Sequence, residues 1–172
     1  MSKNFSKNLI NFFSGIKNYT TEKILINKIR YGLKNKEFKM HLQFIVDNKT
    51  KRIVSGEALS RWETSEGEVI MPGKYIGVME KSGLIIKFDY YMFEMVCDKL
   101  SKWADTDFKE LTISCNFTRI TISEKDFVTK IKNIAEILNV RYCVGFKNCL
   151  IKMNFCHKKL KISLNKKPRY FL

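Results

Sequence analysis

The chain has 172 residues, of which 45% are hydrophobic and 13% aromatic, and this composition is typical of one folded domain rather than of a disordered chain. No apolar run of about 18 residues occurs in it, so the sequence predicts no transmembrane segment. The five cysteines form no Cys-x-x-Cys pair, which favours reduced thiols and a cytoplasmic location over a disulfide framework or a zinc site.

The formal net charge of +15 is concentrated in the two flanks of the chain. Residues 1–36 carry net +7 and residues 141–172 carry net +9, whereas residues 37–140 hold fifteen basic and sixteen acidic side chains. A basic stripe built into a folded surface would indicate phosphate recognition, and basic flanks are weaker evidence for it. The charge pattern therefore argues against nucleic acid as the main partner. A basic nucleic-acid or membrane-surface binder that uses the flanks stays as an alternative.

The predicted elements begin with a helix over residues 22–35, where apolar side chains recur every three to four residues. Residues 38–46 then alternate apolar and polar side chains, as a strand does, and residues 47–50 are turn formers. A second strand follows over residues 52–59. Because the connection is too short for a parallel crossover, we expect the two strands to be antiparallel.

Helices alternate with strands in the next part of the chain. Pro72 begins a short helix that Gly83 ends, and residues 87–103 carry the long apolar stripe of a further helix. A third strand over residues 111–117 precedes a last helix, for which Ser123 is the expected N-cap. This order predicts an α/β fold with a largely parallel sheet.

The basic tail, residues 141–172, has no acidic residue and no clean helical or strand period. We therefore expect that it builds no strand of the fold and is more mobile than residues 37–140. An acid-free tail containing Lys and Asn is also what an out-of-frame reading of an AT-rich gene produces, which we state as a hypothesis.

Residues 56–62 read Gly-Glu-Ala-Leu-Ser-Arg-Trp, which resembles the Glu-x-Leu-x-Arg signature of EAL domains, the bacterial cyclic-di-GMP phosphodiesterases. Three other blocks resemble the family in the same order. Residues 38–47 match a strand that usually ends in Tyr-Gln-Pro-Ile-Val, residues 72–85 match a proline-started helix closed by Gly-Leu-Ile, and residues 111–119 match a strand ending in Val-Asn-Leu-Ser. The resemblance covers residues 37–140.

The family fold is a modified TIM-like (β/α)8 barrel whose first strand is antiparallel to the next, in agreement with the predicted hairpin. Such a barrel needs about 250 residues, and the chain has no Asp-Asp pair for the family's Asp-Asp-Phe-Gly block. The resemblance therefore implies an incomplete barrel. It divides the chain into a basic N-terminal segment (1–21), a lead-in helix (22–36), the N-terminal part of an EAL-type domain (37–140) and a basic tail without a family match (141–172).

The chemistry of the family is hydrolysis of a phosphodiester with two divalent cations, Mg or Mn, held by carboxylate and amide oxygens. The resemblance makes Glu57 and Asn116 metal ligands near the ends of two strands. It assigns a substrate phosphate oxygen to Arg61, contact with cyclic-di-GMP to Gln43 and packing on a guanine to Leu59.

Ordinary roles stay open for the same residues. Glu57 can be a solvated carboxylate at a strand end, and Asn116 can be a turn residue. Arg61 can form a surface cation–π pair with Trp62. Phe44 stands where the family usually has Pro, which alters the expected backbone geometry there.

Because most ligands of a two-metal site are missing, we expect a signal-transduction domain of the cyclic-di-GMP phosphodiesterase family that is truncated and catalytically inactive by itself. The alternatives are a non-catalytic cyclic-di-GMP-binding or protein-interaction module and the basic binder described above. A half-barrel would leave the apolar faces of residues 38–46 and 111–117 uncovered, so a homo-oligomer or a protein partner is also expected.

Overall fold

The computed structural model describes residues 20–140, 145–146 and 161–164. Residues 20–34 are helical, so the helix predicted over residues 22–35 is present. The elements that follow are, in chain order, β1 (Phe38–Val46), β2 (Ile53–Glu63), β3 (Val69–Ile70), the 3-10 helix η1 (Pro72–Lys74), α2 (Ile76–Ser82), α3 (Leu84–Lys102), β4 (Thr112–Phe117), α4 (Arg119–Ile122), α5 (Phe127–Ile137), β5 (Gly145–Phe146) and β6 (Lys161–Leu164). Among the described residues, none of the helices combines the length and the apolar composition that crossing a membrane requires.

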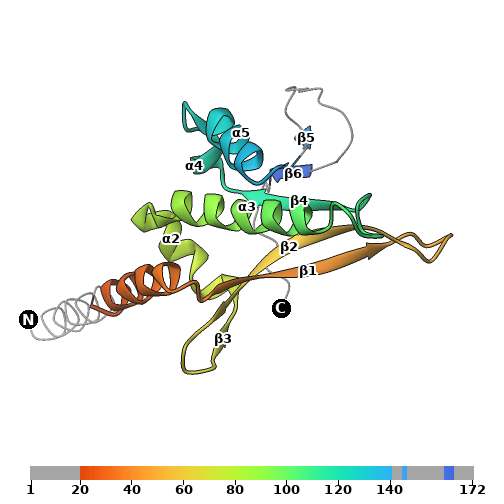
Figure 1. Ribbon diagram of the computed structural model, residues 1–172. Helices are drawn as coiled ribbons and strands as arrows, with labels where there is room; N and C mark the ends of the chain where they lie inside the picture. The colour runs from red at the N-terminus through yellow and green to blue at the C-terminus, as the bar shows by residue number, and fades with distance from the viewer. Residues whose placement is uncertain (1–19, 141–144, 147–160, 165–172) are drawn as a thin grey trace, which may run out of the picture.

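The strands form one mixed sheet in the order β1-β2-β4-β6-β5, with β3 paired to β2 (Figure 1). β1 and β2 are antiparallel, with Phe38 opposite Trp62 and Gln43 opposite Glu57. The pairs β2–β4, β4–β6 and β5–β6 are parallel. The predicted hairpin and the α/β order are therefore confirmed.

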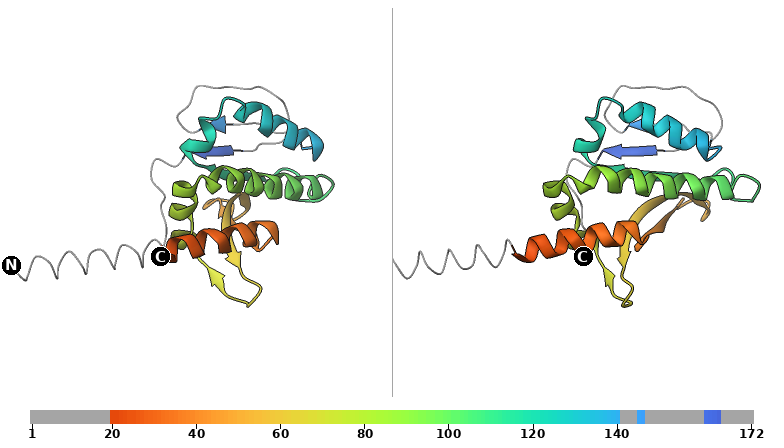
Figure 2. Two further views of the ribbon diagram at one scale, coloured as in Figure 1. Left: turned by 90° about the vertical axis from the view of Figure 1, so that its left-hand side faces the viewer. Right: turned by 60° about the vertical axis from the view of Figure 1, so that its left-hand side comes forward.

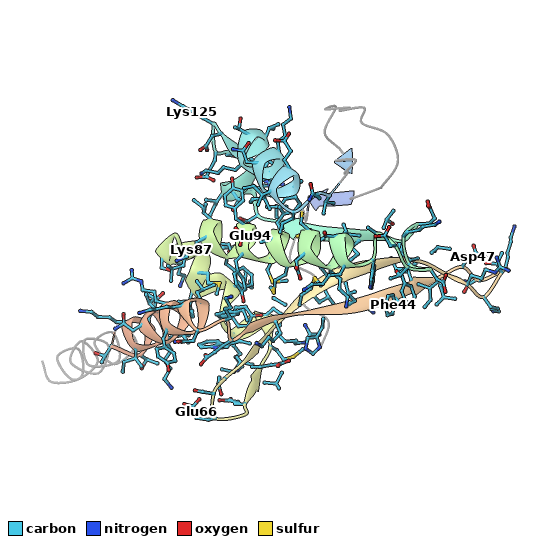
Figure 3. The ribbon with its side chains drawn as sticks, in the orientation of Figure 1. Phe44, Asp47, Glu66, Lys87, Glu94 and Lys125 are labelled. Carbon is cyan, nitrogen blue, oxygen red and sulfur yellow. The ribbon has the colours of Figure 1, made fainter. Side chains whose placement is uncertain are left out.

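One carboxylate organises the turn between β1 and β2. Asp47 Oδ1 accepts hydrogen bonds from the backbone N–H of Lys49 at 3.0 Å, the backbone N–H of Thr50 at 2.7 Å and the Thr50 hydroxyl at 2.9 Å. Such local bonds make Asp a turn former, and they set the register of the two strands. Figure 3 shows Asp47 at the free end of this hairpin.

The sequence predicted two helix boundaries, a helix end at Gly83 and an N-cap at Ser123, and the second of these is wrong. Gly83 has a left-handed φ of 73°, ends α2 as predicted and leads directly into α3, which begins at Leu84 rather than at residue 87. Ser123 is wrong as an N-cap: it is the C-cap of α4, and α5 begins after Asp126. The reason is that residues 119–122 form an extra helical turn.

The apolar core lies between one face of the sheet and the helices. α3 lies between α5 and the helix of residues 20–34 in both views of Figure 2. Four core aromatic rings, with centroids 5.0 to 6.0 Å apart, join β1, β2, the start of α2 and α3; they are Phe38, Trp62, Tyr75 and Phe88. This cluster fixes the end of the sheet where β2 finishes.

The helix of residues 20–34 approaches β2 closely at Gly32. A Cβ atom at this position would lie 2.9 Å from Nε1 of Trp62, so only glycine allows the observed packing. Trp62 Nε1 donates a hydrogen bond of 2.9 Å to Oε2 of Glu37, which is also buried. The lead-in helix is therefore part of the folded unit.

The expectation that the apolar faces of the first and third strands lie uncovered is wrong for β4 and for the start of β1. Ile113, Cys115 and Phe117 of β4 are at most 3% exposed, because helices of this chain cover them, and Phe38 of β1 is fully buried. Exposed apolar side chains instead gather toward the free end of the hairpin; they are Phe44, Ile45, Val46, Ile53 and Val54.

The expectation that the tail builds no strand is also wrong. β6 pairs in parallel with β4, and β5 pairs in parallel with β6. Backbone groups on the open edge of β4 can pair with a strand as short as four residues, because the ladder uses only N–H and C=O groups. This pairing removes the main physical support for the out-of-frame hypothesis. The predictions for residues 1–19, 141–144, 147–160 and 165–172, among them most of the residues predicted to be mobile, lie outside the described residues.

Candidate functional site

Strands β1, β2 and β4 direct alternate side chains to opposite faces of the sheet. The face that carries the buried core residues lies against α3. The opposite face, here called the polar face, is mostly polar and charged. Its residues are Lys39, His41, Gln43, Glu57, Leu59, Arg61, Glu63, Ser114 and Asn116, of which Leu59 alone is apolar. All five predicted site residues lie on this face.

Glu57 and Asn116 meet although 59 residues separate them in sequence. The parallel pairing of β2 and β4 places Glu57 beside Ser114, and Asn116 follows on the same face of β4. Asn116 Nδ2 donates a hydrogen bond of 2.9 Å to Glu57 Oε1, and both side chains are half-buried. The structure thus brings the two predicted metal ligands together; their role as ligands stays a prediction.

The three predicted substrate contacts surround this pair. Gln43 lies opposite Glu57 in the antiparallel ladder and is exposed. Leu59 and Arg61 follow Glu57 on the same face of β2 and are half-buried. Arg61 Nη1 donates a hydrogen bond of 2.7 Å to the carbonyl oxygen of Ser60, which leaves other guanidinium donors for a ligand.

The cation–π alternative for Arg61 is contradicted by the alternation of β2. Trp62 is 2% exposed and belongs to the core face, whereas Arg61 lies on the polar face. Within the described part of the chain, the cation–π contacts are instead those of Lys99 with Trp103 and of Lys130 with Tyr90. Arg61 is therefore available to a ligand on the polar face.

The donor atoms of the pair suit a hard divalent cation in kind. Glu57 offers carboxylate oxygen and Asn116 offers its side-chain carbonyl Oδ1, and Mg and Mn prefer such ligands. Within the described residues, no group of three His, Cys, Asp or Glu side chains is placed to hold a metal ion. The pair therefore fits part of a cation site.

Sequence reasoning missed two polar contacts, one on the polar face and one on the core side of the sheet. His41 Nε2 lies 2.8 Å from Glu63 Oε1, a contact between neighbouring strands. Asp89 of α3 is 4% exposed and accepts three hydrogen bonds from the turn after β4, through Thr118 and Thr121. A signal for Asp89 was present, because an acidic residue interrupts the apolar stripe of α3.

Burial raises the pKa of the Asp89 carboxyl, and the hydrogen bonds from Thr121 and Thr118 oppose this rise. A buried carboxylate without partners would be costly, so the three donors explain how the charge is tolerated here. The carboxyl group of Asp89 belongs to the core side of the sheet, and Asn116 belongs to the polar side.

Comparison with known proteins places these residues in a family. A model of the EAL domain matches residues 26–147. The signaling protein YkoW of Bacillus subtilis (strain 168) is 30% identical over 105 residues, which are 61% of this chain and 13% of YkoW. Cyclic di-GMP phosphodiesterase PdeR of Escherichia coli (strain K12) is 28% identical over 119 residues, which are 69% of this chain and 18% of PdeR.

A solved structure, that of the PaMucR phosphodiesterase in complex with c-di-GMP, shares the fold with a TM-score of 0.65 and 21% identity. The likeness covers 72% of this chain and 51% of the solved one. This chain thus spans less than a fifth of the two curated relatives and about half of the solved one. Its antiparallel first strand, its parallel strands and its connecting helices form an incomplete α/β barrel. The chain belongs to the EAL domain family.

Proposed function

We propose that this chain binds cyclic di-GMP on its polar face and that the 172-residue chain does not hydrolyse the dinucleotide by itself. The hydrogen bond of 2.9 Å between Asn116 and Glu57 carries the proposal, because it joins a carboxylate and an amide from two strands at one point. The names of PdeR and of the PaMucR complex support the choice of ligand.

In this proposal each residue of the polar face has a separate task. Glu57 and Asn116 would hold a Mg or Mn ion, which would supply a Lewis-acid contact to a phosphate oxygen of the dinucleotide. Arg61 binds a phosphate oxygen of the ligand, since its forked donors match that geometry. Gln43 and Leu59 contact the dinucleotide from the neighbouring positions of β1 and β2.

We propose that hydrolysis is absent because the chain supplies too few oxygen ligands for two metal ions. Two-metal hydrolysis clamps the attacking and the leaving oxygen between two cations, and each cation needs several oxygen ligands. Glu57 and Asn116 supply two side chains, and the sequence has no Asp-Asp pair to supply those that the resemblance implies. Binding without hydrolysis follows, which makes the chain a cyclic-di-GMP-binding or protein-interaction module.

Isothermal titration with cyclic di-GMP in Mn²⁺ buffer tests the binding. We expect Glu57→Ala to weaken the affinity at least about tenfold, which is roughly 1.4 kcal/mol. Glu94→Ala is the matched control, because it removes an exposed carboxylate of α3 (Figure 3), and it should bind like the unaltered chain. Equal affinity of the Glu57→Ala variant and the unaltered chain would refute the assignment of Glu57.

An assay of dinucleotide cleavage with Mg²⁺ or Mn²⁺ tests the second part. The unaltered chain should cleave cyclic di-GMP no faster than the Glu57→Ala variant. A metal-dependent rate that disappears in this variant would show that the chain is an active phosphodiesterase.

Three further expectations stay predictions. The basic-flank alternative concerns residues 1–21 and 141–172. A salt titration distinguishes it from ligand binding on the polar face, because only charge-driven binding collapses with salt.

A homo-oligomer or protein partner is supported by the exposed apolar side chains at the hairpin end. A cytoplasmic location is supported by cysteines without a pairing pattern, of which Cys97 and Cys115 are free and buried.

A further inference from the structure

A buried polar network outside the polar face joins α3 to the turn after β4. Asp89 Oδ2 accepts hydrogen bonds from the Thr118 backbone N–H at 2.8 Å, the Thr118 hydroxyl at 2.8 Å and the Thr121 hydroxyl at 2.7 Å. Thr121 is fully buried, and Asp89 is 4% exposed. Three hydrogen bonds that converge on one carboxyl oxygen tie this turn to α3.

The turn begins directly beyond the candidate site. Thr118 follows Phe117, the last residue of β4, and Asn116 precedes it. Phe117 is 3% exposed, and its ring centroid lies 5.6 Å from that of Phe93 and 5.1 Å from that of Phe127. With Phe117 held on the core face, strand alternation directs Asn116 to the polar face, where it donates to Glu57.

We infer that Asp89 is a positioning residue for the candidate site: it anchors Thr118 so that the end of β4 keeps Asn116 directed at Glu57. All three donors to Asp89 come from one turn of four residues, so the carboxylate acts on the end of β4 rather than on the core as a whole. The inference deepens the proposed function, on which its ligand-binding part rests.

An apolar residue in the place of Asp89 could pack in the core, but it could not accept hydrogen bonds from this turn. It would leave the Thr118 N–H and two hydroxyls without the acceptor that they now share, and each buried unsatisfied donor is costly. The Thr118 and Thr121 hydroxyl oxygens lie 3.1 Å apart, so the two threonines form one network with the carboxylate. Through this network the Asp89 carboxyl group, 29 residues from Thr118 in sequence, holds the backbone near Asn116.

The test uses the full chain with Asp89→Asn and with Val96→Ala as a matched control. Val96 is a fully buried residue of the same helix, so its truncation weakens the core without touching the turn. The first readout is the NMR signal of the Asn116 side-chain amide in ligand-free protein, assigned by its loss in Asn116→Asp. We expect the signal to move toward that of a solvated amide in Asp89→Asn and to stay in place in Val96→Ala.

The second readout is cyclic-di-GMP affinity in Mn²⁺ buffer, which we expect to fall about tenfold in Asp89→Asn and to be kept in Val96→Ala. If the unaltered chain does not bind the dinucleotide but the Asn116 signal moves, the proposed function fails and the positioning role stands. If Asp89→Asn leaves the Asn116 signal in place, the inference is overturned.

Should Asp89→Asn fail to fold, Thr121→Val makes the same test from the other side of the network. It keeps the shape of the side chain and removes one of the three donors to Asp89. The Asn116 signal should move in this variant by a smaller amount, and an unchanged signal would again overturn the inference.

Discussion

The two faces of the β1–β2–β4 sheet differ in burial and in the kind of side chain that they carry. The core face of β4 is covered by helices of the same chain, and its residues Ile113, Cys115 and Phe117 are buried. The polar face of the same strand carries Ser114 and Asn116, which stay half-buried. Stability therefore resides on one face, and the groups that can bind a ligand are kept on the other.

The largest difference between the faces should come from truncating a core aromatic residue. Phe93 is fully buried against Phe117, so Phe93→Ala should lower the free energy of unfolding by about 3–5 kcal/mol. Leu59→Ala on the polar face should lower it by about 1 kcal/mol or less. Urea unfolding followed by circular dichroism measures both, and similar losses would break the distinction.

Neighbouring residues of one strand sharpen the comparison. Trp62→Phe removes the donor to buried Glu37 and should lower the free energy of unfolding by about 1–3 kcal/mol. Arg61→Ala, one residue earlier on the polar face, should change it by about 0.5 kcal/mol or less and weaken cyclic-di-GMP binding. The same unfolding experiment measures both variants; a loss of stability in Arg61→Ala as large as in Trp62→Phe would contradict the assignment of the two faces.

The buried carboxyl of Asp89 predicts a pH dependence of stability. Burial, with a smaller contribution from Glu80, raises the pKa of Asp89 in the folded state above that of the unfolded chain, 3.8. In the window above pH 3.8 the folded state then holds a proton that the unfolded state has lost, so this group makes the fold less stable as pH rises. The stability of the unaltered chain minus that of Asp89→Asn should fall as pH increases from 3.8 through the raised pKa. A difference that is constant with pH would contradict the raised pKa.

The smallest expected effect concerns two core thiols, Cys97 and Cys115, which should not react with an alkylating reagent in the native protein. Burial raises the pKa of Cys97 to about 12 and raises the pKa of Cys115 as well. Only the thiolate is nucleophilic, so iodoacetamide at pH 8 should leave both residues unmodified in native protein and modify them in urea. Peptide mass spectrometry reads the two sites separately; modification of native Cys115 at the rate of a free peptide thiol would show that the core face is open.

Local signals in the sequence were sufficient for most of the described elements. The alternation of residues 38–46 predicted β1, the turn formers after it predicted the hairpin, and Gly83 predicted the end of α2, because each depends on neighbouring residues. The four motif blocks predicted the family that the EAL domain match confirms. The five candidate residues lie on one face, and their roles stay predictions.

What only the tertiary structure decided are contacts between segments far apart in the chain. Asn116 donates to Glu57, and Asp89 accepts from Thr118 and Thr121, because the parallel register and the path of α3 bring them together. The pairing of β6 with β4 has the same origin, since a backbone ladder needs no side-chain period. Sequence periodicity reports which face of an element is apolar; it does not report which distant backbone or carboxylate will lie against that element, because that depends on how the whole chain packs.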